Sequence, residues 1–546
     1  MPRTSALAVP EWNLAPVSHN ATGGALEGAE RTSRETFTWN PQIISPDQQI
    51  NPLKEMADAR GRDSIQNDGY ATGAVNTYRD SIVGAQYRVN AQPDWKTLGF
   101  TKEWADEFQM TMERRFNLLS DSLDCWFDAG GKLTFTGIIR LAVGGFLMTG
   151  EVLQTAEWLR GGGRPFSTAI QTVSPSRLSN PDGLPDDQTL SRGVKKDIYG
   201  APIGYWIKVT HPGTFFDARA WEWRFVEARK PWGRRMVLHI LDPLQPDQTR
   251  GVSDMVSVLK QMRMTKKFQD VTLQNAVVQA SYAAAIESEL PTDVVYASMG
   301  AGQNGFATML GEYMTALESY TKGATNIQID GVKMPHLFPG TKLNLKPMGS
   351  PGGVGDGFEE SLLRHVAAGL GLSYEEFAHD YTKTNYSSAR ASMANTWKGM
   401  QTKKKNVADK DANFIYQLWM EEQINAYDVP LPAGVSKAQF QTMFYDPLYR
   451  EAICKASWIG ASRGQIDELK ETQSALLRIN AGLSTREAEI ARLGEDWREV
   501  FEQLAREQEM AKKLGIEFNT DAAKPGANKA QQTMRGNKDE EEDDEL

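Results

Sequence analysis

The chain carries few residues whose types and spacing point to catalysis, and the most suggestive pair is His379 next to Asp380. An imidazole beside a carboxylate has the groups of a general base. Adjacent residues on a helix point about 100° apart, so such side chains rarely act together. The six histidines show no HxxxH, HExxH or HxH spacing, and two cysteines cannot build a cysteine metal site. The sequence therefore predicts no catalytic residue, no metal site and no cofactor.

A second candidate is the glycine-rich segment Gly349–Gly357, which has the composition of a phosphate-binding loop but not its sequence. It does not fit GxxxxGK[ST], and Glu359 and Glu360 follow it rather than lysine. Carboxylates at a helix start repel phosphate, so a flexible linker or hinge is the favoured interpretation. No serine stands in a GxSxG elbow either. A structural or assembly role is therefore favoured over an enzyme.

The most distinctive polar stretch is Asp380–Arg390, with the sequence DYTKTNYSSAR. It joins two helical patterns, and a connection of this length, rich in hydroxyls and amides, is more typical of a functional surface than of a spacer. The local alternative is a capped turn, in which Ser387 or Ser388 is the N-cap of the next helix and Asn385 accepts left-handed geometry. The two roles are compatible.

Composition narrows the class of protein. The 546 residues carry a net charge of −10, with a pI of about 5.4. Tight binding of nucleic acid needs clustered Lys and Arg, so this balance disfavours a protein that grips nucleic acid, but not one that lets it pass. No apolar run approaches the roughly 18 residues of a membrane span, and the N-terminus lacks the apolar core of a signal peptide. We expect a soluble cytoplasmic protein of two to four folded units, without membrane contact.

The elements that position these residues follow from the pattern along the chain. Alternating segments such as IQTVSPSRL, APIGYWIKVT and AWEWRFV predict strands in an α+β region. The run Ser253–Glu289 lacks Gly and Pro and predicts one long helix or two abutting ones. A helix from Phe358 to Gly371, the polar stretch, and a long helix from Ala389 toward Tyr427 follow.

Two further expectations concern the C-terminal half. Lys403, Lys404 and Lys405 lie across the long helix and are most simply a solvated patch. From about Ser457 to Gly515 the pattern is helical again, as in a small terminal unit. The acidic run DEEEDDE near the end of the sequence repels itself and stays solvated.

An ordered series of segments resembles the portal proteins of lambda-like tailed phages. The segments are NDGYATGAVNTYRDSIVGAQYRV, FTGIIRLAVGGFLMTGEV, IQTVSPSRLSNP, QTRGVSDMVSVLKQMRM, YAAAIESEL, MPHLFPGTKLNL, SLLRHVAAGLGLSYEEF, DYTKTNYSSARAS and AGLSTREAEIARLGEDWREVF. The resemblance is colinear from about residue 35 to residue 515 and leaves out only the two tails.

This resemblance implies a multi-domain α+β portal fold, mostly helical, with wing, stem, clip and crown, that assembles into a ring of twelve subunits. On that basis we expect a disordered arm (1–35), an α+β wing (36–250), a first stem helix (251–290), a clip (291–348), a linker with the second stem helix (349–372), a tunnel loop (373–390), a long wing helix (391–427), a helical crown (428–515) and an acidic disordered tail (516–546).

The resemblance also implies a function. Portal rings occupy the unique capsid vertex of the virion, and double-stranded DNA passes through them during packaging and ejection. The implied partners are the terminase large subunit, a head-completion or adaptor protein, the major capsid protein and the scaffold, with assembly in the host cytoplasm. No enzymatic activity is implied, because ATP hydrolysis belongs to the terminase.

Candidate site residues follow from this placement. DNA in transit presents every sequence, so a channel needs weakly binding polar groups, and small residues let twelve helices pack closely. The expected channel residues are Thr382, Lys383, Thr384, Asn385, Tyr386, Ser387, Ser388 and Arg390; the stem-packing residues are Ala276, Ala280, Ala283 and Ala284; the clip surface includes His336 and Lys342. Two other classes stay open, a nuclease acting through His379 and Asp380 and a DNA-binding packaging subunit.

Overall fold

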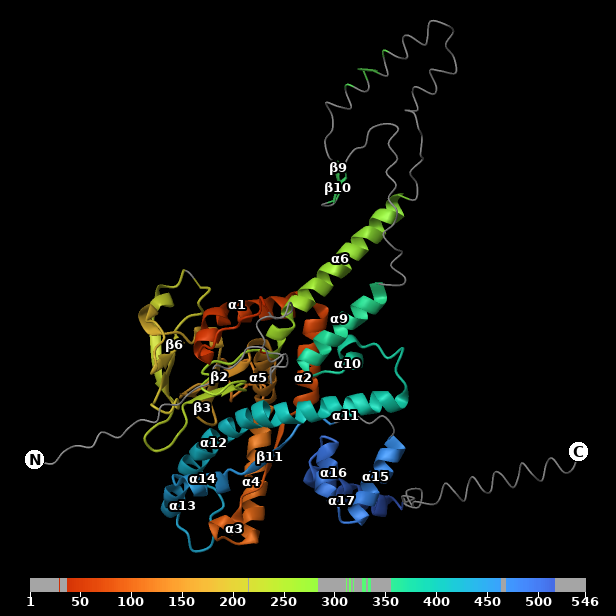
Figure 1. The fold of residues 1–546 in the computed structure, drawn as a ribbon. Helices are drawn as coiled ribbons and strands as arrows, with labels where there is room; N and C mark the ends of the chain where they lie inside the picture. The colour runs from red at the N-terminus through yellow and green to blue at the C-terminus, as the bar shows by residue number, and fades with distance from the viewer. Residues whose placement is uncertain are drawn as a thin grey trace, which may run out of the picture.

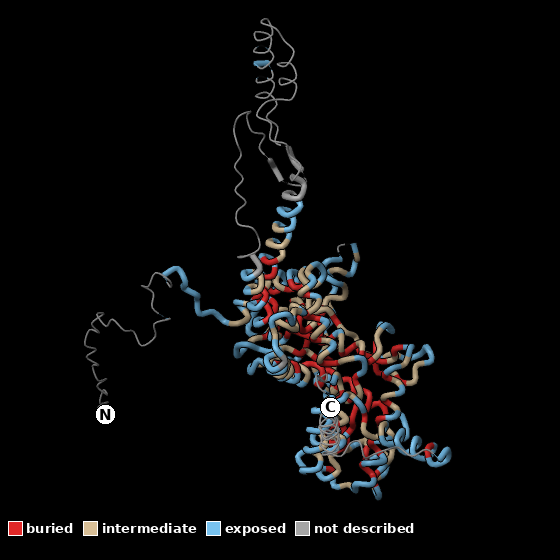
Figure 2. Tube along the Cα trace, turned by 90° about the vertical axis from the view of Figure 1, so that its right-hand side faces the viewer, coloured by how far each residue is buried: buried red, intermediate tan, exposed pale blue. Residues whose placement is uncertain are grey.

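The computed structural model describes residues 37–214, 216–282, 355–462 and 468–515, with a few further positions between 29 and 334. Figure 1 shows a mixed body of helices and sheets from which one long helix, α6 (Leu259–Tyr282), projects beside α9 (Gly355–Leu370). Figure 2 shows that the buried residues gather in this body, whereas most of the described part of α6 is exposed. The molecule therefore has a globular part and a protruding helical part.

The first two helices, α1 (Pro46–Asn67) and α2 (Gly69–Ile82), meet at Asp68. The carboxylate of Asp68 accepts hydrogen bonds from the backbone amides of Tyr70 and Ala71, at 2.9 and 3.2 Å. Such an N-cap satisfies amides that the first helical turn leaves without partners. The helices α3 (Trp95–Leu98), α4 (Lys102–Ser120) and α5 (Phe135–Thr149) follow.

Strands dominate the next part of the chain, as the alternating patterns predicted. β2 (Glu151–Trp158) lies between β3 (Thr168–Val173) and β8 (Val237–Leu241) in an antiparallel sheet, with Leu153 opposite both Val173 and His239. A second antiparallel sheet has the order β4-β5-β6-β7. Its strands are β4 (Leu190–Ser191), β5 (Val194–Lys196), β6 (Pro202–Lys208) and β7 (Trp223–Glu227). A separate hairpin pairs β9 (Ile327–Ile329) with β10 (Val332–Met334).

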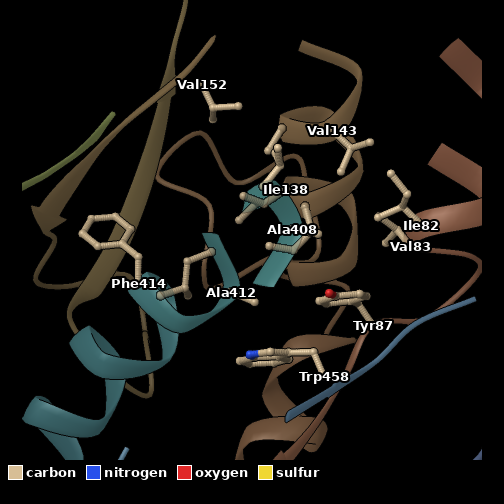
Figure 3. Packing of buried hydrophobic residues seen from close by; sticks show 14 of the residues in the cluster. Ile82, Val83, Tyr87, Ile138, Val143, Val152, Ala408, Ala412, Phe414 and Trp458 are labelled. Atoms are coloured by element: carbon tan, nitrogen blue, oxygen red, sulfur yellow. The ribbon is translucent and has the colours of Figure 1, made fainter. Parts of the chain in front are cut away.

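The long helix predicted from Ala389 toward Tyr427 is confirmed as one continuous helical segment. α11 (Tyr386–Lys403) passes through a π-helical turn, Lys404–Ala408, into α12 (Asp409–Ala426). Figure 3 shows Ala408 and Ala412 of this segment packed in the apolar core close to Ile138 of α5. In the same core, the rings of Tyr87 and Trp458 stack with centroids 5.8 Å apart.

The C-terminal part differs from the prediction at its start, because a strand stands where a helix was expected. β11 (Ala456–Ile459) pairs antiparallel with β1 (Arg88–Ala91), Ser457 lying opposite Asn90. The pairing partner is too distant in sequence to leave a local signal. The remaining helices are α10 (Tyr374–Ala378), α13 (Lys437–Phe444), α14 (Pro447–Ile453), α15 (Glu468–Asn480), α16 (Arg486–Arg492) and α17 (Trp497–Leu514).

The predicted helix Ser253–Glu289 is shorter at its N-terminal end than expected. A 3-10 turn, Asp254–Ser257, precedes α6, and the Ser253 hydroxyl accepts a 3.0 Å hydrogen bond from the Met255 amide. Beyond Tyr282 the predicted helix lies outside the described residues. The helix predicted at Phe358–Gly371 is confirmed as α9, which begins three residues earlier, at Gly355.

The interpretation of three consecutive lysines as a solvated patch is wrong for two of them. Lys403 forms an ion pair with Asp254 and lies over the rings of Tyr78 and Phe146. The Lys404 side chain is only 14% exposed, and its ammonium group lies 2.9 Å from Asp409 Oδ1. Only Lys405, with a 73% exposed side chain, fits the prediction. The π-helical turn begins at Lys404, so the two paired lysines lie where the helix geometry changes.

Candidate nucleic-acid interface

The polar connection between α9 and α11 is shorter than predicted. The short helix α10 occupies its first part, and residues 379–385 form the loop between α10 and α11. His379 ends α10 with a left-handed backbone, at φ 52°. The prediction assigned left-handed geometry to Asn385, which is extended instead, at φ −88° and ψ 162°.

Asn385, not either predicted serine, is the N-cap of α11. Its side-chain oxygen accepts a 2.9 Å hydrogen bond from the Ser388 amide, and the Ser388 hydroxyl donates to the same oxygen over 2.8 Å. Asn at the N-cap with Ser at the third helical position gives two hydrogen bonds to one acceptor. As a result, Tyr386, Ser387, Ser388 and Arg390 lie in the first turns of the helix rather than in the loop.

Asp380 organises the start of the loop. Its Oδ1 atom accepts from the amide and the hydroxyl of Thr382, at 3.0 and 2.6 Å, and its Oδ2 atom accepts from the Tyr374 hydroxyl over 3.2 Å. The hydrogen bonds from Thr382 lower the pKa of Asp380 below its ordinary value. The carboxylate holds the loop backbone and forms no hydrogen bond with His379, so the geometry does not favour the nuclease hypothesis.

Lys383 is fixed by a carboxylate of the preceding helix. Its ammonium group lies 2.9 Å from Glu360 Oε2, and Arg364 binds the other oxygen of Glu360 over 2.6 Å. The hydrogen bond from Lys383 lowers the pKa of Glu360, and the charge of Arg364 lowers it further. Because the Lys383 side chain is 71% exposed, solvent screens this ion pair and its energetic contribution is small. Its main consequence is to offset the positive charge of Lys383.

Glu375 connects the loop to the first turns of α11. Its two carboxylate oxygens accept from the hydroxyls of Thr384 and Ser392, at 3.3 and 3.2 Å. Three carboxylates, those of Glu360, Glu375 and Asp380, therefore hold the loop from beneath. Among the expected channel residues with described side chains, Thr384 is half-buried and the rest are exposed. The described loop thus exposes mostly uncharged hydroxyl and amide groups, and the three carboxylates lie behind them.

Arg390 differs from Lys383 in its surroundings. The Arg390 side chain is exposed, and the described residues give it no ion pair. For an arginine in the first turns of a helix, a phosphate contact and a structural ion pair are the two alternatives. The geometry favours the phosphate contact, since an unpaired guanidinium remains available to a passing anion.

The other predicted site residues are only partly within the described chain. Ala276 is exposed on α6, and Ala280 lies in the same helix. Ala283, Ala284, His336 and Lys342 lie outside the described residues, as do almost all of residues 1–35 and all of residues 516–546.

The prediction of stem packing named only alanines and missed larger apolar residues on the same helix. Met264, Val271, Leu273 and Val277 are 57%, 54%, 66% and 61% exposed. At 3.6 residues per turn, Met264 and Val271 share one face, and Leu273 and Val277 share another, about 150° away. A third face is covered by α9, where Phe268 meets Phe358 with ring centroids 6.0 Å apart. A helical-wheel projection of the large apolar residues in this segment of the sequence would have shown these positions.

Among the described residues, no set of three or more His, Cys, Asp or Glu side chains is arranged to hold a metal ion. No helix in the same residues is both long and apolar enough to cross a lipid bilayer.

Comparisons with known proteins identify relatives along most of the chain. Residues 32–404 match the model of a family described as phage portal protein, lambda family. The chain is 36% identical over 496 residues to the portal protein of Escherichia phage N15, covering 90% of this chain and 89% of the relative. It is also 36% identical over 481 residues to portal protein B of Escherichia phage lambda, covering 88% of each.

Solved structures give a more distant match. The chain aligns with a chain of the native gene transfer agent virion at 12% identity, with a TM-score of 0.35, covering 84% of this chain and 94% of that one. A second match is a chain from the neck of a native gene transfer agent particle computed with C12 symmetry, at 12% identity and a TM-score of 0.33, covering 84% and 97%.

Proposed function

Because this chain belongs to the lambda family of phage portal proteins, we propose that twelve copies of it form a closed ring through which double-stranded DNA passes during packaging and ejection. The ring occupies one vertex of the capsid and becomes part of the virion, after assembly in the host cytoplasm. The polar loop before α11 faces the channel. The wing contacts the major capsid protein and the scaffold.

The observation that carries this proposal is the pair of exposed apolar faces on α6. A closed ring joins different surfaces of identical subunits, so each subunit needs one face for each neighbour. Met264 with Val271 and Leu273 with Val277 supply two such faces on a helix that projects from the body. Large apolar side chains gain roughly 1.5–3 kcal/mol each when they are fully buried, so neighbouring copies that cover them stabilise the ring.

The channel loop supports the same function through its charges. Groups that touch moving DNA must bind phosphate weakly at every step. The Glu360 carboxylate offsets the charge of Lys383, and Glu375 and Asp380 add negative charge beneath the exposed hydroxyls. Such a surface offers DNA brief polar contacts and little lasting attraction.

The clip is the proposed docking surface for the terminase large subunit and, later, for the head-completion or adaptor protein. The hairpin of β9 and β10 lies within this part of the chain. The resemblance of the sequence to lambda-like portal proteins supports this assignment, in which His336 and Lys342 belong to the partner surface.

Electron microscopy of the purified protein tests the ring. We expect class averages with a central hole wide enough for duplex DNA. Leu273→Asp places a charge on one α6 face and is expected to prevent ring closure. The matched control is Leu118→Asp on α4, because Leu118 is 78% exposed and lies on the body. Wild-type monomers under all assembly conditions, or complete rings from Leu273→Asp, would contradict the proposal.

A further inference from the structure

A basic pocket lies on the body of the molecule and includes no residue of the loop before α11. It has a volume of about 350 Å³ and is formed by the turn between β7 and β8, by α12 and by the middle of α14. Its charged lining residues are Arg229, Arg234, Arg235, Lys410 and Arg450, with Glu421 and Glu451. Five cations and two carboxylates give this pocket a positive charge in a chain whose net charge is −10.

The two carboxylates are already engaged. Glu421 pairs with Arg234 over 2.6 Å, and both side chains are nearly buried, at 11% and 10% exposure. Glu451 accepts hydrogen bonds from the Gln417 amide, at 3.2 and 3.3 Å. In the described chain, the four other cations of the pocket have no carboxylate within ion-pair distance. The pocket therefore has more positive than negative side chains, and four of its cations form no ion pair in the described chain.

Three of these arginines are held close to one another. Arg229 and Arg450 both donate to the carbonyl oxygen of Gly233, at 3.5 and 3.2 Å. The loss of water around the Arg235 guanidinium lowers its pKa. The positive charges of Arg229 and Arg450 lower this pKa further, against the opposing charge of Glu451. Neighbouring guanidinium groups carry the same charge and repel one another. An anion bound between them would relieve that repulsion and accept several charge-assisted hydrogen bonds.

The chain itself contains an anion of matching character. Asp539–Glu545 has the sequence DEEEDDE, seven carboxylates in succession without a basic residue. Twenty-three residues separate it from Gly515, the last described position. An extended segment of that length spans up to about 80 Å, whereas a compact chain of this size has a radius of gyration of about 24 Å. The acidic segment is therefore long enough to reach the pocket on its own subunit or on a neighbour.

We propose that the pocket between the β7–β8 turn, α12 and α14 binds the acidic segment Asp539–Glu545 of this same polypeptide. Carboxylate side chains on a peptide can enter a recess and pair with arginine in the two-pronged geometry that arginine favours. Duplex DNA presents its phosphates on a stiff cylinder, which suits an open basic surface better than a recess. Tethering adds a high effective concentration, so weak individual contacts suffice.

Fluorescence anisotropy with a labelled peptide of residues 531–546 tests this site. The receptor is the full chain with Asp539–Glu545 changed to the matching amides, so that its own segment cannot compete. We expect this receptor to bind the peptide more tightly than the parent chain does. Adding Arg229→Gln, Arg235→Gln and Arg450→Gln is expected to weaken binding about tenfold or more. A peptide carrying seven amides should not bind.

The matched control changes three exposed arginines away from the pocket, Arg60→Gln, Arg160→Gln and Arg486→Gln. This control removes the same charge from the whole molecule as the pocket variant does. Because its arginines lie outside the pocket, we expect it to weaken peptide binding by about twofold or less. Equal losses in the pocket and control variants would show non-specific attraction and overturn the proposal. A labelled DNA duplex provides the second arm. If the pocket variant loses affinity for DNA but not for the peptide, the site is a phosphate site and the proposal is wrong.

Discussion

Gln154 and Asp411 meet inside the protein, where Gln154 Nε2 donates a hydrogen bond to Asp411 Oδ2 over 3.1 Å. Both residues are fully buried, and Gln154 Oε1 and Asp411 Oδ1 have no hydrogen-bond partner in the described structure. A protonated carboxyl has an O–H donor, which an ionised carboxylate lacks. Burial raises the pKa of Asp411 well above its ordinary value. Burial and the unpaired oxygens both favour a neutral carboxyl in this pair, which joins β2 to α12.

We expect Asp411→Asn to gain stability relative to the parent chain as pH rises. In the unfolded parent, Asp411 ionises near pH 4, whereas the folded carboxyl keeps its proton. For each pH unit between the pKa of Asp411 in the unfolded chain and its pKa in the folded chain, the free energy of unfolding of the parent therefore falls by about 1.4 kcal/mol. Asparagine has no such proton to lose. Urea unfolding of both proteins at about pH 4.5, 6 and 7.5 measures this difference in the free energy of unfolding.

The control for this comparison is Asp428→Asn, because the Asp428 side chain is fully exposed. Its effect on stability should stay nearly constant over the same pH range. A constant difference between Asp411→Asn and the parent would mean that the folded protein holds Asp411 in its charged form.

Arg250→Met is expected to destabilise the protein by about 3–5 kcal/mol, because it leaves a buried carboxylate short of its main partner. Arg250 lies 2.6 Å from Glu151, with both side chains almost fully buried, at 3% and 0% exposure. Burial by itself raises the pKa of Glu151, but the charges of Arg250 and Lys54 hold it well below its ordinary value. Equilibrium unfolding in urea gives the change.

Arg224→Met is the matched substitution at an exposed ion pair. Arg224 is 51% exposed and pairs with Glu157. We expect it to cost about 1 kcal/mol or less. Similar losses for the two variants would show that the contacts of Arg250 contribute no more than a surface pair.

The sequence predicted the long helix better than it predicted the contacts of that helix. Helical spacing predicts one apolar face with Met393, Trp397, Met400, Val407, Phe414 and Leu418. The last four are buried, whereas Met393 and Trp397 are half-buried. Lysines 403–405 look alike in sequence, yet their surroundings differ, because Asp254 and Trp458 come from distant parts of the chain. Hydrophobic spacing reports which face is buried, but not which polar groups meet a lysine at its edge.

The candidate loop shows the same limit. Its polarity and its position between helices were visible in DYTKTNYSSAR. The role of Asn385 as N-cap depends on backbone angles, and the pairing of Lys383 with Glu360 spans 23 residues. Neither leaves a local pattern, so the sequence indicated a functional surface without indicating its charge balance.

Lys404→Met is expected to cost about 2 kcal/mol, whereas Lys405→Met should cost about 0.5 kcal/mol or less. Lys404 donates to Asp409 Oδ1 and to the Trp458 carbonyl oxygen, both at 2.9 Å, and lies over the ring of Tyr87. Lys405 reaches Asp409 only at 3.4 Å and is exposed. The two adjacent substitutions remove the same charge, so urea unfolding isolates the value of burial. Equal costs would mean that the contacts of Lys404 add nothing.

Glu360→Gln is expected to slow DNA transit, because it releases the charge of Lys383 toward the proposed channel. In the parent chain this ammonium group is held 2.9 Å from Glu360 Oε2. The measurement is the packaging rate of rings carrying each variant, with a terminase motor and ATP. Arg390→Ala should weaken retention of packaged DNA more than Lys383→Ala does, since only the charge of Lys383 is already offset. The double variant Glu360→Gln with Lys383→Ala should package at the parent rate, and failure to restore that rate would show that Glu360 acts independently of Lys383.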